Sequence, residues 1–128
     1  MDSTKLSKSG SLKLSRFGRH PKAGYCTQGS IWLEKDGELY IGGGRALLLE
    51  HIEQHGSIAA ASRVMKITYR NAWLWVDAMN RLAPSPLVEK ITGGSSGGIY
   101  AKLTDEGRQA LAQYRTLRDE LDKVISEE

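Results

Sequence analysis

Apolar and polar positions divide the chain into a polar leading stretch and a series of short periodic segments. Before about residue 29 the sequence is rich in Ser, Gly and Lys and has almost no periodic apolar pattern, which predicts a flexible basic arm over residues 1–28. Runs at 30–34 and 39–41 are typical of strands, and the Asp36-Gly37 pair between them is a strong hairpin signal. We therefore expect residues 29–128 to form the ordered domain.

Helical spacing of apolar residues follows the predicted hairpin. Residues 45–55 carry Leu48, Leu49 and Ile52 at the one-sided spacing of an amphipathic helix, and Gly56 supplies a stop signal. Ser57 is typical of an N-cap for a short helix over 58–65. Thr68 is a second such residue, and the spacing behind it predicts a longer helix over 69–82.

Two further strands and a last helix complete the predicted elements. Residues 87–92 and 100–103 are strand-like and are joined by a glycine-rich loop without apolar side chains, which we expect to be a mobile wing. A final helix is predicted over about 104–126, with apolar residues recurring at threes and fours. That stripe favours a dimerisation helix, although packing within one subunit would give the same pattern. The predicted dimer contacts are Leu111, Tyr114, Leu117, Leu121 and Ile125.

The order of these elements predicts the fold class: a mainly α protein with a small β wing, a winged helix-turn-helix with a long C-terminal dimerisation helix. In such a fold the helix over 69–82 enters the major groove. Arg70 can pair with guanine and Asn71 with adenine, whereas any one of the basic residues alone would fit a solvated surface equally well. The predicted DNA contacts are Ser57, Lys66, Thr68, Tyr69, Arg70, Asn71, Lys90, Gly94, Ser95, Ser96 and Lys102.

The distribution of charged residues along the chain favours a polyanionic partner. The net charge is +3 and the pI is about 9.1. Residues 57–102 hold six basic side chains against two acidic ones, whereas the residues after Thr104 hold seven acidic and four basic. One region of the molecule is therefore suited to phosphates and another would repel them.

Several other classes of protein are disfavoured. A single cysteine, Cys26, and the lack of a long apolar run predict a cytoplasmic protein with no membrane partner. No cofactor is predicted, and an enzyme is the weakest alternative because no nucleophile, base and acid can be nominated together. His51 and His55 could share a metal ion on one helix, but no third ligand stands out and a solvated face is the preferred interpretation.

Two stretches of the chain carry a family resemblance. "GSIAAASRVMKITYRNAWLWVDAMNRL" and "PLVEKITGGSSGGIYAKLTDEGRQAL" resemble the N-terminal DNA-binding domain of the molybdate-responsive ModE-type transcriptional regulators over about 29–114. The most specific parts are "YRNAW", "MN", "PLVE", "TGG" and "LTxxG". The resemblance implies a homodimer on a pseudo-palindromic operator, with Ser57, Thr68, Tyr69, Arg70 and the wing glycines facing DNA. Regulators of this type bind their oxyanion in a C-terminal domain. The sequence up to Glu128 does not include such a domain, so we expect no direct molybdate sensing.

The leading hypothesis is a sequence-specific regulator of molybdate or oxyanion metabolism that binds duplex DNA. The alternative is a small oxyanion-binding sensor module, which would use Gly42-Gly43-Gly44-Arg45 or the wing loop as an anion nest. A third hypothesis is a helix-turn-helix used only for protein contacts.

Overall fold

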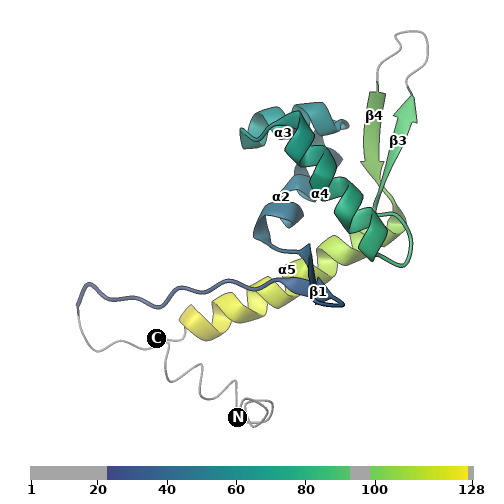
Figure 1. The fold of residues 1–128 in the computed structure, drawn as a ribbon. Coiled ribbons are helices and arrows are strands. Elements are labelled where there is room, and N and C mark those ends of the chain that lie inside the picture. The colour runs from purple at the N-terminus through teal and green to yellow at the C-terminus, as the bar shows by residue number, and fades with distance from the viewer. Residues whose placement is uncertain (1–22, 93–98, 127–128) are drawn as a thin grey trace. The chain divides into compact units, whose positions relative to one another are not determined.

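The computed structural model describes residues 23–92 and 99–126 (Figure 1). The predicted wing residues Gly94, Ser95 and Ser96, and most of the predicted basic arm, lie outside these ranges. Residues 32–115 form one compact unit, and 23–31 and 116–126 are the described parts of a second. The elements are β1 (Leu33–Lys35), β2 (Glu38–Ile41), α2 (Gly43–His55), α3 (Ile58–Met65), α4 (Tyr69–Leu82), β3 (Val88–Thr92), β4 (Ile99–Leu103) and α5 (Asp105–Ser126).

The first hairpin follows from its turn. Asp36 and Gly37 have φ angles of 52° and 83°, the left-handed conformation that a two-residue hairpin turn requires at both positions. The turn pairs Lys35 with Glu38 in an antiparallel ladder, which confirms the predicted hairpin. Its first strand begins at Leu33 rather than Ser30, and its second ends at the fully buried Ile41.

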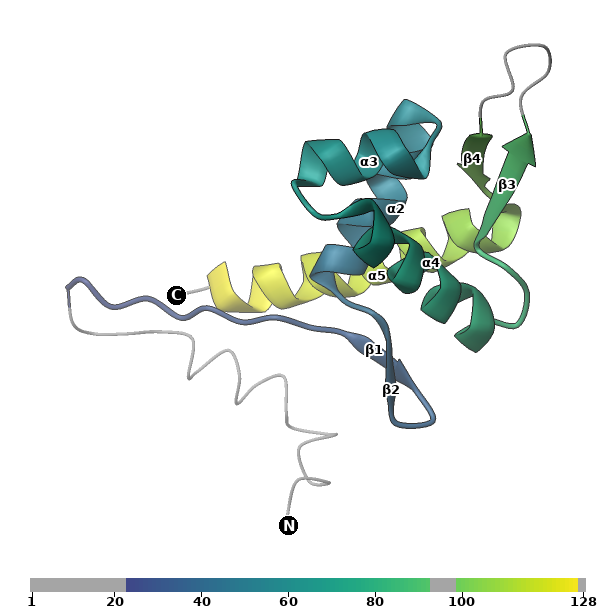
Figure 2. The ribbon, with the colours of Figure 1, turned by 45° about the horizontal axis from the view of Figure 1, so that its top comes forward.

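Three helices pack together in the larger unit, as the predicted caps and stops suggested. The Ser57 hydroxyl accepts a hydrogen bond from the Ala60 amide at 2.9 Å, and the Thr68 hydroxyl accepts one from the Asn71 amide at 3.0 Å. Gly56 ends α2 in the left-handed conformation at φ 77°. Figure 2 shows α3 beside α2 and α4, and all three helices contribute to a common apolar core. The members contributed by these three helices are Ala46, Leu48, Leu49, Ile52, Ile58, Ala61, Ala72, Val76, Met79 and Leu82.

The start of α5 is fixed against the segment that leads into β3. Thr104 caps the helix by accepting from the Gly107 amide at 3.0 Å, while its own amide donates to the Leu87 carbonyl at 2.9 Å. Gly107 lies so close to Leu87 that a Cβ at this position would collide with the Leu87 carbonyl oxygen. The "PLVE" and "LTxxG" segments are therefore packed against each other, and the glycine is required by that approach.

The predicted fold class, a mainly α winged helix-turn-helix with a small β wing and a long C-terminal dimerisation helix, is wrong. Residues 23–92 and 99–126 contain four helices and two separate two-stranded antiparallel sheets, β1–β2 and β3–β4. The prediction gave the Asp36-Gly37 hairpin no place in the class, although its local turn closes a sheet of its own. It also treated the final helix as a single dimerisation element.

The two halves of α5 belong to different units. Leu111 and Tyr114 are buried in the unit formed by 32–115, so their side chains pack within their own chain. In the other unit Gly29 lies against Leu121 and Ile125, with its constructed Cβ 3.2 Å from the Ile125 Cδ1 atom. Leu117, Leu121 and Ile125 are each partly exposed.

Candidate functional site

The first turn of α4 is open to solvent. Thr68, Tyr69, Arg70 and Asn71 are all exposed, and the Thr68 cap uses the backbone amide of Asn71 rather than its side chain. Within the described ranges neither the Arg70 guanidinium nor the Asn71 carboxamide has a hydrogen-bond or ion-pair partner. Both groups are therefore available to a ligand that approaches the N-terminal end of this helix.

A tight turn sets the angle between α3 and α4. Lys66 adopts the left-handed conformation at φ 60°, and its amide donates to the Arg63 carbonyl at 3.2 Å. The next amide, Ile67, reaches back to the Ser62 carbonyl at 3.1 Å. The Lys66 side chain is exposed at this turn, whereas Ser57, at the start of α3, is only partly exposed.

An aromatic and cationic cluster joins α4 to β3. The Lys90 Nζ atom lies 4.4 Å from the ring centroid of Trp73, and Tyr69 meets the same indole edge-on with centroids 6.0 Å apart. Such contacts contribute about 0.5–1 kcal/mol when exposed. The Trp73 ring thus contacts Tyr69 of its own helix and Lys90 of β3. The cluster holds one predicted DNA contact, Lys90, close to another, Tyr69.

Asn80 fastens the other end of α4 to the same hairpin. Its carboxamide oxygen accepts from the amides of Leu87 and Val88 at 2.8 and 3.1 Å, and its nitrogen donates to the Val88 carbonyl at 3.1 Å. These three bonds satisfy backbone groups that no strand partner reaches. The "MN" of the sequence motif is thus a structural joint between α4 and β3.

Charge compensation separates two regions of the described chain. Outside α3 and the first turn of α4, the arginines have acidic or carbonyl partners: Arg45 with the Leu39 carbonyl, Arg81 with Glu38, Arg108 with Glu53 and Asp105, Arg115 with Glu50, and Arg118 with Asp122. Among the residues with described placement, Arg63, Lys66 and Arg70 have no acidic partner within ion-pair distance. The arginines without an acidic or carbonyl partner therefore lie on α3 and the start of α4, while Lys90, Lys102 and Lys123 of the described residues are also without an ion pair.

The β3–β4 hairpin carries the two remaining predicted contacts with described placement. Lys90 and Lys102 are both exposed, and the ladder places Lys102 opposite Glu89. Opposite charges in that cross-strand position attract each other weakly, so Lys102 offers a less available charge than Lys90.

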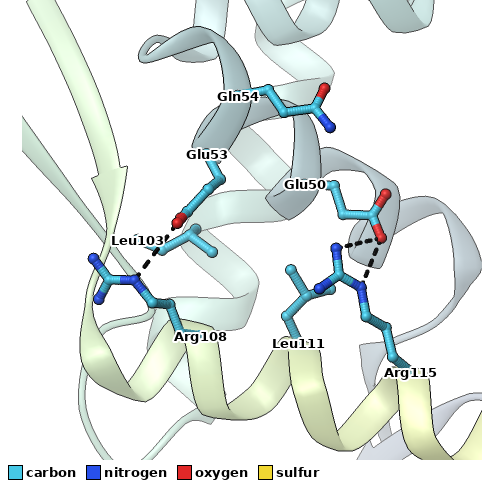
Figure 3. A pocket seen from close by; sticks show the side chains of 7 residues that line it. All are labelled: Glu50, Glu53, Gln54, Leu103, Arg108, Leu111 and Arg115. Atoms are coloured by element: carbon cyan, nitrogen blue, oxygen red, sulfur yellow. Dashed lines mark hydrogen bonds and ion pairs between the residues drawn. The ribbon is translucent and has the colours of Figure 1, made fainter.

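A pocket of about 240 Å³ lies between α2, β4 and the first half of α5 (Figure 3). Two arginines line it, and each faces a glutamate: Arg108 lies 3.5 Å from Glu53, and Arg115 lies 2.8 Å from Glu50. Because the positive charges are already compensated, the pocket is a poor site for an anion.

The glycine-rich segment before α2 is largely occupied by its own chain. Arg45 donates to the Leu39 carbonyl at 2.7 Å, and burial lowers the pKa of its guanidinium. Gly44 faces the Trp75 ring, with its constructed Cβ 3.4 Å from the indole. The anion nest considered at Gly42-Gly43-Gly44-Arg45 therefore has no arginine that is free of hydrogen bonds to its own chain.

The two histidines of α2 form a stack rather than a metal site. The rings of His51 and His55 lie 5.5 Å apart at 18°, and the Nδ1 atom of His51 is buried without a hydrogen-bond partner. Over 23–92 and 99–126, no group of three or more potential ligands could hold a metal ion. In the same ranges, no helix has the length and apolarity needed to cross a membrane.

Sequence reasoning left two exposed residues of this region out of the candidate site. Arg63, in the last turn of α3, adds to the uncompensated charge near Lys66. Leu74 is 50% exposed on α4. The signal for Leu74 was present in the sequence, because it lies off the apolar stripe formed by Ala72, Val76 and Met79.

Comparison of the sequence with known proteins finds relatives named for molybdenum and relatives named as transcriptional regulators. No protein-family model matches the chain. The chain is 46% identical over 81 residues to the molybdenum transport protein ModE of Azotobacter vinelandii, covering 63% of this chain and 30% of that protein. It is 39% identical over 96 residues to the molybdenum-pterin-binding protein MopA of Rhodobacter capsulatus, covering 75% and 36%. It is 36% identical over 87 residues to the DNA-binding transcriptional dual regulator ModE of Escherichia coli K12, covering 68% and 33%.

These relatives are named as regulators or as transport and molybdenum-pterin-binding proteins, and none of the three names describes an enzyme. Their names do not specify a winged-helix domain. The chain spans about a third of the length of the curated relatives that it matches. Over that third, this chain is similar to ModE-type regulators and Mop proteins.

Proposed function

We propose that this chain binds duplex DNA in a sequence-specific manner, as the DNA-contacting part of a transcriptional regulator related to the ModE type. The observation that carries the proposal is the open first turn of α4, where Arg70 and Asn71 lack partners among the described residues. The neighbouring uncompensated charges of Arg63 and Lys66 favour a polyanion over a neutral partner.

In the proposed complex the first turn of α4 lies against base edges in the major groove. Arg70 donates two hydrogen bonds to guanine O6 and N7, and Asn71 pairs with adenine N6 and N7. Lys66 and Arg63 contact phosphates on one side, and Lys90, held over Trp73, contacts the backbone beside them. The N-terminal amides of α3 at Ser57 and of α4 at Thr68 and Tyr69 give further phosphate contacts.

A homodimer on a pseudo-palindromic operator extends this proposal. Because Leu111 and Tyr114 are buried in their own unit, the contact between subunits would use the partly exposed Leu117, Leu121 and Ile125. Analytical ultracentrifugation of Leu117→Arg tests this arrangement. The variant should sediment as a monomer, and an unchanged dimer would contradict this choice of surface.

The test of DNA binding starts from a randomised duplex library, with selected sites measured by fluorescence anisotropy at several salt concentrations. Arg70→Ala should cost about 1–3 kcal/mol on the preferred site and relax the preference at one position. Lys66→Ala should weaken all sequences alike and reduce the salt slope by about one. Lys123→Ala, on the distal half of α5, is the matched control and should change neither. Failure to select any preferred duplex at low salt would refute the proposal.

A second candidate function is binding of a molybdenum-containing oxyanion. The names of relatives support it more directly than they support the full DNA-binding proposal, since MopA is named for molybdenum-pterin binding. The arginines of the pocket, Arg108 and Arg115, each form an ion pair with a glutamate, and Arg45 donates to a backbone carbonyl. These contacts argue against an anion site at either place. Calorimetry with molybdate, tungstate, sulfate and phosphate separates the two functions. Heat with molybdate together with no DNA preference would favour the oxyanion module.

A further inference from the structure

Leu74 is an apolar side chain on the side of α4 that does not pack into the core. The buried stripe of this helix is Ala72, Val76, Met79 and Leu82, whereas Leu74 is 50% exposed. A half-exposed leucine is unremarkable by itself. Its position one helical turn after Arg70 is what makes it informative.

Helix geometry places Leu74 on the same face as Arg70. Residues four apart are neighbours on a helix surface, and a rise of 1.5 Å per residue separates them by about 6 Å along the axis. Successive bases on one strand are about 3.4 Å apart, so this separation corresponds to slightly less than two base pairs. A helix that presents Arg70 to one base pair therefore presents Leu74 to the next pair or the one after it.

The major groove offers an apolar side chain such as Leu74 one kind of apolar partner. Among the groups that base pairs display there, only the C5-methyl of thymine is apolar. Asp77, exposed one turn beyond Leu74, would be repelled by phosphates, which limits the contact to the first two turns of α4. The uncompensated charges of Arg63 and Lys66 favour nucleic acid over an apolar protein surface as the occupant.

We infer that Leu74 is a specificity-determining residue that contacts the methyl group of a thymine one to two base pairs from the guanine contacted by Arg70. This inference rests on the proposed DNA-binding function and goes beyond it by assigning an apolar base contact. It predicts a thymine at a defined spacing in the preferred site.

The test uses the full chain and the duplex selected from the random library. Each thymine is replaced singly by deoxyuridine, which removes only the methyl group. At one thymine, one or two pairs from the position affected by Arg70→Ala, the wild-type affinity should fall about fourfold, the value expected for one methyl group leaving an apolar contact. Leu74→Ala should bind the thymine and deoxyuridine duplexes equally, and Leu74→Gln, of similar length but polar, should lose the discrimination as well.

Leu47→Ala is the matched control, since Leu47 is a 44% exposed leucine on α2. This variant should keep the wild-type discrimination. Equal sensitivity to deoxyuridine in the wild type and Leu74→Ala, or a loss of self-association in Leu74→Ala without a change in discrimination, would overturn the inference while leaving DNA binding intact. Failure to select any preferred duplex would instead remove the proposed function itself.

Discussion

Gly107→Ala tests the close approach of the start of α5 to the backbone of Leu87. The glycine lies in the first turn of α5, and an added Cβ would collide with the Leu87 carbonyl oxygen and lie 3.0 Å from its carbonyl carbon. The obstacle is backbone rather than a movable side-chain end. The same carbonyl accepts from the Thr104 amide at 2.9 Å, so it cannot move away without loss of that bond. The substitution must therefore displace the helix start from the segment before β3.

The expected cost combines two opposing effects. Overpacking of a well-packed site costs about 1–3 kcal/mol, and a backbone collision belongs at the upper end of that range. Alanine recovers about 1 kcal/mol through its higher helix propensity. The net expectation is a loss of about 2 kcal/mol in the free energy of unfolding, equivalent to about 8–16 °C in melting temperature for a domain of this size.

Urea denaturation followed by circular dichroism measures this loss. Gly43→Ala is the control, because that glycine also begins a helix but its constructed Cβ lies 3.6 Å from the Tyr114 hydroxyl, an ordinary contact. The control should be neutral or more stable by up to about 1 kcal/mol. Equal midpoints for the two variants would refute the argument that Gly107 is required by the approach of Leu87.

Three further predictions concern the joints that position α4 and the first hairpin. Asn80→Ala removes partners from two amides and one carbonyl and should cost about 2–4 kcal/mol in urea denaturation; a cost below about 1 kcal/mol would show that these bonds do not hold α4 to β3. Thr68→Ala should cost about 1 kcal/mol through loss of the cap, and Thr68→Ser should restore most of it; equal stability of both variants would contradict a capping role. The hydrogen bond and charge of Arg81 hold the pKa of Glu38 below its ordinary value, so this pair stabilises the fold above the unfolded-state pKa and the contribution is lost as the pH falls through the folded-state pKa. A carbon-detected NMR titration should show the pKa of Glu38 rising in Arg81→Gln, and no rise would argue against the pair in solution.

Local signals explain why individual elements could be predicted from the sequence. The Asp36-Gly37 turn, the Gly56 stop and the caps at Ser57, Thr68 and Thr104 act on residues within three or four positions, so their chemistry is readable from the sequence alone. The fold class could not be assembled correctly from them. It needed the information that the first hairpin closes a separate sheet and that the two halves of α5 group with different parts of the chain.

The candidate site shows the same division. Exposure of Arg70 and Asn71 follows from the apolar stripe of their own helix, which the sequence displays. The backbone partners of Asn80, the Lys90 contact of Trp73 and the approach of Leu87 to Gly107 come from residues outside the same helix, and no periodicity indicates them. Residues of the "MN" and "LTxxG" motifs, which carried the family resemblance, hold α4, β3 and α5 together. Charge compensation likewise depends on pairs such as Arg81 with Glu38, which only the fold brings into contact.

The central claim is that the first two turns of α4 meet the base pairs, and the most direct test is amide chemical-shift mapping of the full chain titrated with its selected duplex. The account predicts large shifts at Thr68–Leu74 and around Lys66, with little change at Arg108 and Arg115. Perturbations confined to the surface around Glu50, Arg108 and Arg115, with the amides of 68–74 unmoved, would contradict it.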